Sequence, residues 1–267
     1  MSNRIITIRA SSFGTFFDCA LRFEAEQINR MAKRGSLRAW LGTSIHAGTA
    51  AYDQAIIDDV FMSVDEAAGI MVDMLWQPPE TLERDEKLSL KEAERISLIL
   101  LSRYCKEIAP GAEYAAVEGA LKPLDIDYEG ITLRFTGTMD RARVVRSLNG
   151  RVIRDIKSGG RLIDSDGKVI VKARAAQVGT YQLLDENTTG QLTCGAEIAA
   201  LQTSSKPQVG VSHIFDAKAL MLGDEARPGL IEIAAKMLKA GVFPPNPSSS
   251  LCSKKYCANW DRCAYHE

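Results

Sequence analysis

Two stretches decide the fold of this chain: Phe135-Thr-Gly-Thr-Met-Asp-Arg141 and Arg151-Val-Ile-Arg-Asp-Ile-Lys-Ser-Gly159. The second is rich in β-branched residues and ends in glycine, which predicts the end of a strand. Side chains two apart on a strand share one face, about 7 Å from each other, so Asp155 and Lys157 point the same way. A hairpin between the stretches brings Asp140 alongside. Two carboxylates beside a lysine favour a site that holds a divalent metal and activates water, and phosphodiester hydrolysis is the hypothesis that follows.

Length and composition fit an ordinary globular protein. The chain has 267 residues, of which 46% are hydrophobic and 25% are charged, enough for one large domain or a domain with a satellite. It contains no apolar run of the roughly 18–20 residues that span a bilayer. Its first residues do not resemble a signal peptide. We therefore expect a cytoplasmic protein without a membrane partner, with thiols or metal ligands rather than disulfides.

The distribution of charge is more informative than the net charge of −1. Residues 53–94 carry twelve acidic and three basic side chains, whereas residues 134–174 carry eleven basic side chains and four aspartates. The basic excess coincides with the candidate site, and basic residues from Arg134 to Arg174 are expected to line an approach for phosphate groups. A solvated charged face is the alternative, because four acids lie within that stretch.

Hydrophobic periodicity predicts an α/β core in which helices cover a mixed sheet. We expect helices at 11–23 (capped by Ser11), 41–59, 173–186 and 229–240, and strands at 115–126, 131–145, 152–156 and 208–215. Asn149-Gly150 is a strong hairpin signal between the second and third strands.

Several further side chains are candidates for the same site. Glu118 lies in the first predicted strand. Gln177 and Tyr181 are four apart on a predicted helix, hence on one face. His46 lies in a helix with small neighbours that let it point into a cavity, although a lone helical histidine is more often structural. Cys19 falls in a stripe of phenylalanines, where a cysteine is usually part of the core.

The tail loses periodicity and gathers three cysteines, Cys252, Cys257 and Cys263, within twelve residues. Clustered thiols in a reducing compartment indicate a metal site, which needs a fourth ligand. His266 would complete a zinc site and a distant cysteine an iron–sulfur cluster. Three unrelated surface thiols remain the alternative. Cys105 and Cys194 have no clear partners and are taken as structural.

Taken in order, these pieces resemble the RecB-like branch of the PD-(D/E)XK nuclease superfamily. They are most similar to its iron–sulfur members, which include AddB-type nucleases, CRISPR-associated RecB-like exonucleases and phage-encoded relatives. The resemblance covers nearly the whole chain and rests on the cysteine helix from Ser12 to Phe23, Gly42-Thr-Ser-Ile-His46, Gly137-Thr-Met-Asp140, Asp155-Ile-Lys157, Gln177-Val-Gly-Thr-Tyr181 and the cysteine-rich tail.

The resemblance implies a restriction-endonuclease-like fold, with a mixed central sheet flanked by helices, in a single domain of residues 1–267. Within it we expect a helical N-terminal region (1–110), a nuclease core (111–243) and a tail (244–267) that completes a metal cluster with Cys19. One departure concerns the tail: many family members space their last three cysteines as C-x2-C-x5-C, and this chain has C-x4-C-x5-C. That difference leaves the cluster type open between [4Fe–4S] and Zn²⁺.

The resemblance also assigns roles. Mg²⁺ or Mn²⁺ would be held by His46, Asp140, Asp155 and the backbone carbonyl of Ile156, with Glu118 as an additional ligand of lower weight. Lys157 would orient the attacking water, and Gln177 and Tyr181 would shape the site or contact DNA. The cluster ligands would be Cys19, Cys252, Cys257 and Cys263.

The implied function is a metal-dependent DNA exonuclease of recombination or repair, of a phage or mobile-element type. Its partner would be DNA, at single-stranded or duplex ends, and a homo-oligomer or a recombination partner protein is left open. Two alternatives remain. One is an inactive nuclease fold that binds DNA. The other is a zinc-binding interaction module built on the three tail cysteines and His266.

Overall fold

The computed structural model describes residues 4–32, 35–83 and 88–266. Within them the helices are α1 (Ala10–Asp18), α2 (Ala20–Phe23), α3 (Leu37–Ile57), α4 (Val64–Leu75), α5 (Leu90–Arg103), α6 (Ala175–Thr189), α7 (Lys218–Leu222) and α8 (Leu230–Ala240). None of the helices in this part of the chain is long and apolar enough to cross a lipid bilayer.

Two main sheets carry the fold. The larger has the order β10-β9-β8-β7-β4 and the smaller the order β1-β6-β5. β8 runs parallel to β9 and β1 parallel to β6, and the other neighbours are antiparallel. The strands of the larger sheet are β4 (Glu113–Ala120), β7 (Thr138–Val145), β8 (Gly150–Gly159), β9 (Thr193–Gln202) and β10 (Gln208–Val211). Those of the smaller sheet are β1 (Arg4–Arg9), β5 (Leu124–Tyr128) and β6 (Ile131–Thr136). Two short pairs complete the set, β2 (Gly35–Ser36) with β3 (Leu82–Glu83) and β11 (Gly223–Asp224) with β12 (Arg227–Pro228).

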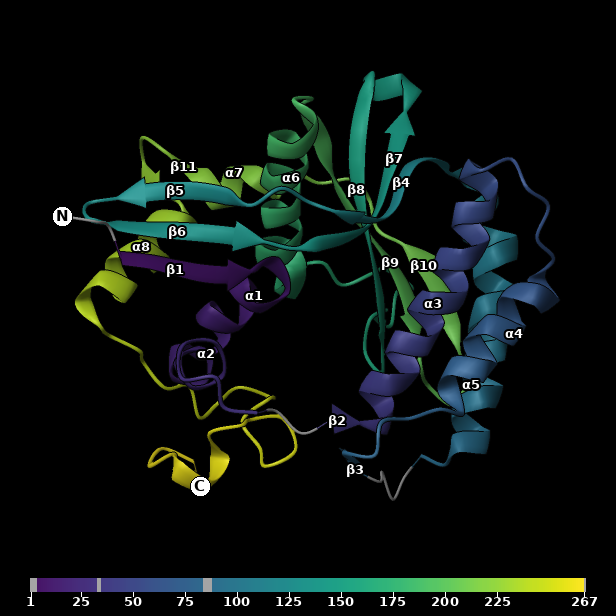
Figure 1. Cartoon of the computed structure of the whole chain (residues 1–267), viewed down its shortest axis with the longest axis horizontal. Coiled ribbons are helices and arrows are strands. Elements are labelled where there is room, and N and C mark those ends of the chain that lie inside the picture. The colour runs from purple at the N-terminus through teal and green to yellow at the C-terminus, as the bar shows by residue number, and fades with distance from the viewer. Residues whose placement is uncertain (1–3, 33–34, 84–87, 267) are drawn as a thin grey trace.

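The larger sheet is buried on both faces. Ile153 and Ile198 belong to a core shared with α1, α6, α7, α8 and the smaller sheet. Ile156 and Leu201, which alternate to the opposite face, belong to a second core formed with α3, α4 and α5. Figure 1 shows these three helices along one side of the larger sheet, with α6 near the junction of the two sheets. This arrangement confirms the predicted mixed central sheet flanked by helices.

The sequence-based boundaries differ from the structure where two predicted strands divide. Residues 115–126 form β4 and β5, and residues 131–145 form β6 and β7, with the halves in different sheets. The second division falls at Gly137. A Cβ atom there would lie 2.9 Å from the ring of Tyr181 and 3.3 Å from the Cβ of Ala10. Only glycine allows the backbone to pass so close to α6 at this position.

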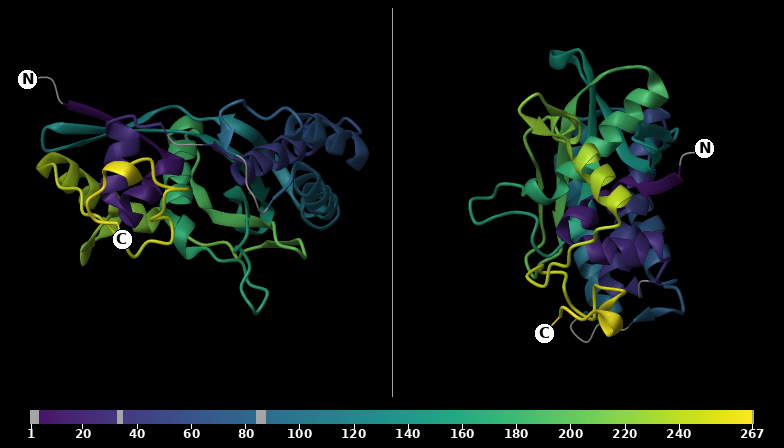
Figure 2. Two further views of the ribbon diagram at one scale, coloured as in Figure 1. Left: turned by 90° about the horizontal axis from the view of Figure 1, so that it is seen from below. Right: turned by 90° about the vertical axis from the view of Figure 1, so that its left-hand side faces the viewer.

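The N-terminal helix is also divided. It begins at Ala10, one residue before the predicted serine cap, and Cys19 is extended (φ −153°, ψ 103°) between α1 and α2. The tail passes beside these two helices (Figure 2). Asn246 Nδ2 donates to the Asp18 carbonyl at 2.8 Å, and Ser249 Oγ donates to the Asp18 carboxylate at 2.8–2.9 Å. These bonds hold the tail against the end of α1 at Asp18.

Candidate active site

Three elements bring a histidine and two carboxylates together. His46 comes from α3, Glu118 from β4 and Asp140 from β7, and each offers a ligand atom within 4.8 Å of those of the other two. His46 Nδ1 lies 3.7 Å from Asp140 Oδ1. The backbone of Glu118 is left-handed (φ 45°), an uncommon conformation for glutamate, at the point of β4 opposite Asp140. Locally strained backbone of this kind is often found at functional sites.

The end of β8 supplies the rest of the predicted site. Lys157 Nζ donates to Asp155 Oδ1 at 2.8 Å, and Gln177 Nε2 donates to the same oxygen at 3.3 Å. Gln177 Nε2 also lies 3.4 Å from the hydroxyl of Tyr181. Asp140 Oδ2 accepts a bond from the backbone N–H of Ile156 at 2.7 Å, which joins this group to the first. The structure thus gathers every predicted catalytic residue, although Asp155 is not a member of the group of three.

The donor set fits a divalent cation. Asp155 is wholly buried, and its Oδ2 has no hydrogen-bond partner among the described residues. Burial raises the pKa of Asp140 and Asp155, which the charge of Lys157 opposes. Burial also lowers the pKa of His46, with Lys157 acting in the same direction, so the imidazole is neutral at pH 7 and able to act as a ligand. An unpartnered buried carboxylate oxygen beside a neutral histidine is stabilised when a cation binds.

A buried ion pair behind the site was not predicted from the sequence. Arg141 Nε lies 2.6 Å from Asp53 Oδ2, and Arg141 Nη1 lies 3.0 Å from Glu118 Oε1 and 2.7 Å from the carbonyl of Asp140. Tyr104 donates to the same Asp53 oxygen at 2.5 Å. One signal was available: Asp53 follows His46 by seven residues, so both lie on one face of their helix.

The basic stretch at 134–174 behaves differently from the expectation. Five of its arginines face acids from other elements, in the pairs Arg134–Asp125, Arg143–Glu197, Arg146–Glu113, Arg151–Asp185 and Arg154–Glu197. The excess of basic residues in the stretch is therefore largely neutralised by acidic side chains from other parts of the fold. These arginines are engaged with acids of the same fold, and the predicted phosphate approach along them loses its main support.

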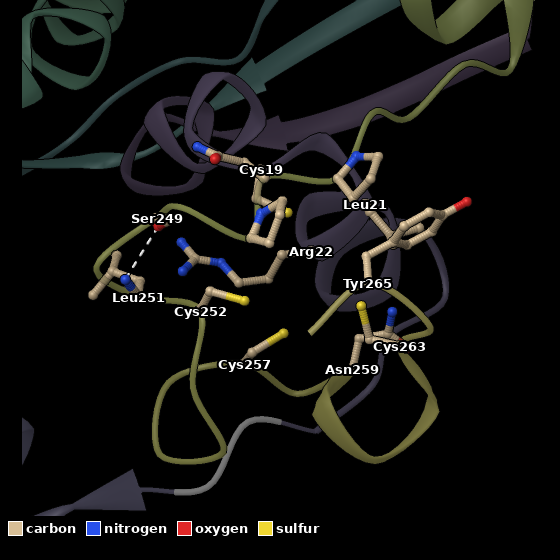
Figure 3. Close-up of a pocket in the computed structure, with 13 residues that line it drawn as sticks. Cys19, Leu21, Arg22, Ser249, Leu251, Cys252, Cys257, Asn259, Cys263 and Tyr265 are labelled. Atoms are coloured by element: carbon tan, nitrogen blue, oxygen red, sulfur yellow. Dashed lines mark hydrogen bonds between the residues drawn. The ribbon is translucent and has the colours of Figure 1, made fainter. Parts of the chain in front are cut away.

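A second candidate site lies where the tail meets α1 and α2. Cys19, Cys252, Cys257 and Cys263 line one cavity, and Figure 3 shows their sulfur atoms directed toward a common space. Cys19 lines this cavity with the three tail cysteines, whereas His266 does not line it, and its ring stacks on that of Trp260 with the centroids 4.0 Å apart. Arg22 also lines the cavity. It is 5% exposed, and its Nε has no hydrogen-bond partner in the described part of the chain.

The two remaining cysteines lie outside this cavity. Cys105 is buried, and burial raises the pKa of its thiol to about 12. Cys194 is exposed on β9, with its thiol 3.5 Å from the carbonyl of Leu148. Neither has a cysteine partner among the described residues.

Comparison with known proteins places these features in a family. A protein from Eubacterium rectale with a provisional designation as an exonuclease has a crystal structure that aligns with a TM-score of 0.55 at 14% identity, over 92% of this chain and 86% of that chain. At this identity the likeness shows the fold alone. The structure of SSO0001 aligns with a TM-score of 0.38 at 12% identity, over 94% of this chain and 95% of that one, and carries no argument. Comparison with curated proteins gives no match. The sequence profile of the PD-(D/E)XK nuclease superfamily matches residues 8–264, and the chain therefore belongs to that superfamily.

Proposed function

We propose that this chain is a metal-dependent DNA nuclease of the RecB-like branch, which hydrolyses phosphodiester bonds. The observation that carries the proposal is the convergence of His46, Glu118 and Asp140 within 4.8 Å, from one helix and two strands. Asp155 and Lys157 stand beside this group, joined to it through the Asp140–Ile156 hydrogen bond. Members of the superfamily use divalent metals, and this donor set suits one.

The residues divide into ligands and positioning groups. His46, Glu118, Asp140 and Asp155 would hold Mg²⁺ or Mn²⁺, together with the carbonyl of Ile156, and the imidazole favours Mn²⁺. A bound divalent cation supplies Lewis-acid chemistry that offsets the charge developing on the phosphate. Lys157 orients the attacking water and stabilises developing negative charge through its ammonium group. Gln177 and Tyr181 keep the Asp155 carboxylate in place.

Exonuclease action on DNA ends is the more specific part of the proposal. The likeness of fold to the Eubacterium rectale protein supports it, as does the resemblance to RecB-like exonucleases. A role in recombination or repair, in a phage or mobile-element setting, follows from the same resemblance. Polarity and strand preference are outcomes of the assay below.

The test is a degradation assay on end-labelled single-stranded and duplex DNA with Mn²⁺, Mg²⁺ or EDTA. Lys157→Ala is expected to lower the rate by about 100-fold or more, since it removes a charge aimed at the reacting phosphate. Lys168→Ala is the matched control, because Lys168 is exposed in the loop after β8. Equal rates for wild type and Lys157→Ala would overturn the proposal. DNA binding without cleavage by the wild type would favour an inactive nuclease fold.

We further propose that Cys19, Cys252, Cys257 and Cys263 hold a structural metal centre. The resemblance implies a [4Fe–4S] cluster in the cavity that these four thiols line, and a single Zn²⁺ is the alternative. Either centre would tie α1 and α2 to the tail. Four cysteine thiolates satisfy both, so the ligand set does not depend on the choice.

Metal analysis and visible absorption of protein purified without oxygen decide between the two centres. Brown protein with about four irons per chain indicates the cluster, and colourless protein with one zinc indicates the ion. Cys252→Ser is expected to lose the metal in either case, whereas Cys194→Ser, which alters the exposed thiol on β9, retains it. Full metal content in Cys252→Ser would contradict the assignment.

A further inference from the structure

Two adjoining hollows run from the N-terminal region to the active site. One, of about 550 Å³, is lined mainly by Arg9, Ser11, Thr138 and Tyr181, together with residues at the end of β4 and at the β6–β7 junction. The other, of about 480 Å³, continues past Arg9 and Ser11 to Arg30. Because they share Arg9 and Ser11, they form one groove, which we call the N-terminal groove. None of the basic side chains of the stretch at 134–174 lines it.

The inner end of the groove reaches the candidate active site. Thr138 precedes Asp140 by two residues on β7, so the two side chains share one face about 7 Å apart along the strand. Tyr181 forms part of the wall, and its hydroxyl lies 3.4 Å from Gln177, which donates to Asp155. A nucleic-acid strand whose reacting phosphate lies at His46, Glu118 and Asp140 would therefore have its neighbouring nucleotides at the inner end of the groove.

The groove has the chemistry of a phosphate-binding surface. Arg9 and Arg30 are exposed, and neither has a carboxylate partner among the described residues. Hydroxyl groups of Thr7, Ser11, Ser12, Thr136 and Thr138 line the rest. Glu26 is the one acid along these walls, and its carboxylate faces Arg22 Nε at 3.9 Å and the backbone N–H of Ala258 at 3.5 Å. Two uncompensated guanidinium groups among hydroxyls favour an anionic ligand.

We propose that the N-terminal groove binds the phosphates of a nucleic-acid strand, with Arg9 and Arg30 as the two charged contacts. This inference rests on the proposed nuclease function and adds the path of the substrate to it. Internal phosphodiesters and a terminal phosphate share the chemistry that the groove recognises. Arg9 lines both hollows and Arg30 lines the second, so one nucleic-acid strand lying along the groove can contact both guanidinium groups.

Binding is measured in the Lys157→Ala background, so that cleavage does not interfere, by fluorescence anisotropy of a labelled single-stranded oligonucleotide over a series of salt concentrations. Arg9→Ala and Arg30→Ala are each expected to weaken binding and to reduce the slope of log Kd against log salt by about 0.7, the value for one phosphate contact on a single strand. Arg146→Ala is the control, since this exposed arginine already pairs with Glu113. Arg161→Ala tests the rival path along the basic stretch.

Oligonucleotides with 5′-phosphate, 3′-phosphate or hydroxyl ends distinguish the two sources of phosphate. Equal sensitivity to Arg9→Ala for all ends supports internal contacts, and sensitivity confined to one phosphorylated end supports a terminal-phosphate contact. Unchanged affinity and salt slope in both groove variants, or the same loss in Arg146→Ala, would overturn the inference. If the wild type cleaves DNA but Arg9→Ala and Arg30→Ala leave the salt dependence of Kd unchanged, the groove proposal is wrong and the nuclease proposal stands. If both variants reduce the salt dependence of Kd but the wild type does not cleave DNA, the nuclease proposal is wrong and the groove proposal stands.

Discussion

Arg141 and Asp53 form a wholly buried ion pair, with Nε and Oδ2 2.6 Å apart and neither side chain exposed to solvent. Asp53 lies on α3, which also carries His46, and Arg141 follows Asp140 on β7. The pair therefore fixes the helix against the strand directly behind the candidate ligands. Removing one partner of such a pair leaves a charge without compensation in the protein interior.

Asp53→Ala should accordingly destabilise the protein by about 3–5 kcal/mol, as measured by urea unfolding followed by circular dichroism. Glu113→Ala is the matched control, because it breaks the Arg146–Glu113 pair, whose side chains are 83% and 51% exposed. That change should leave the free energy of unfolding nearly unchanged, because solvent screens an exposed pair. Similar losses for both variants would mean that the buried pair has no special structural role.

Gly137→Ala should impair activity more than its effect on stability suggests. The added Cβ would lie 2.9 Å from the Tyr181 ring, so the ring must move, and with it the hydroxyl that lies beside Gln177. We expect a cost of about 1–3 kcal/mol in stability and a fall of up to about 100-fold in the cleavage rate. Gly160→Ala, where no atom lies within 4 Å of the new Cβ, should leave both unchanged. A fully active Gly137→Ala variant would contradict the role given to Tyr181.

Arg22→Gln should weaken retention of the metal in the cysteine cavity. Four thiolates leave a zinc or iron–sulfur centre with net negative charge, and Arg22 is a buried cation that lines this cavity. Its nearest acids are Asp18 at 3.6 Å and Glu26 at 3.9 Å. We expect metal affinity to fall by about 10- to 100-fold in a chelator competition. Arg262→Gln, at an exposed position in the same tail, should behave as wild type; if it loses metal equally, general loosening of the tail is the cause.

Stabilisation by Mn²⁺ should increase with pH. Burial raises the pKa of Glu118, Asp140 and Asp155 in the folded protein, so the metal-free fold binds these protons more tightly than the unfolded chain does. These groups therefore stabilise the metal-free fold at low pH. That stabilisation is lost as the pH rises from about 4 through their raised folded-state pKa values. A cation competes with the same protons. The gain in Tm on adding Mn²⁺ should therefore be larger at about pH 8 than at about pH 5, and a gain that is constant or falls with pH would contradict this.

The sequence predicts the parts of the site whose residues are close together in the chain, and it misses the contacts between distant residues. Asp155 with Lys157, and Gln177 with Tyr181, are close in the chain, so the periods of strand and helix fix their common faces. The Arg141–Asp53 pair spans 88 residues, and no periodicity links residues so far apart. The same limit explains the basic stretch, whose acidic partners come from β4, β5, β9 and α6.

The divided strands show a different limit. Alternation reveals which side chains share a face, but it does not reveal to which sheet a strand belongs. Gly137 lies in an alternating run, and its meaning becomes visible only when α6 packs against it. The groove lined by Arg9 and Arg30 was likewise hidden, because these two residues are 21 positions apart and no periodicity shows that they line one surface.

The hydrogen bonds of Asp18 to Ser249 join residues 231 positions apart, and this separation has a consequence for synthesis. At about 5–20 residues per second, a ribosome needs roughly 10–50 s to extend the chain from the first partner to the second. Throughout that interval Cys19 lacks the tail that closes over it. The cysteine cavity therefore cannot form until the tail has been synthesised, and a nascent chain interrupted before residue 249 keeps the Cys19 thiol uncovered.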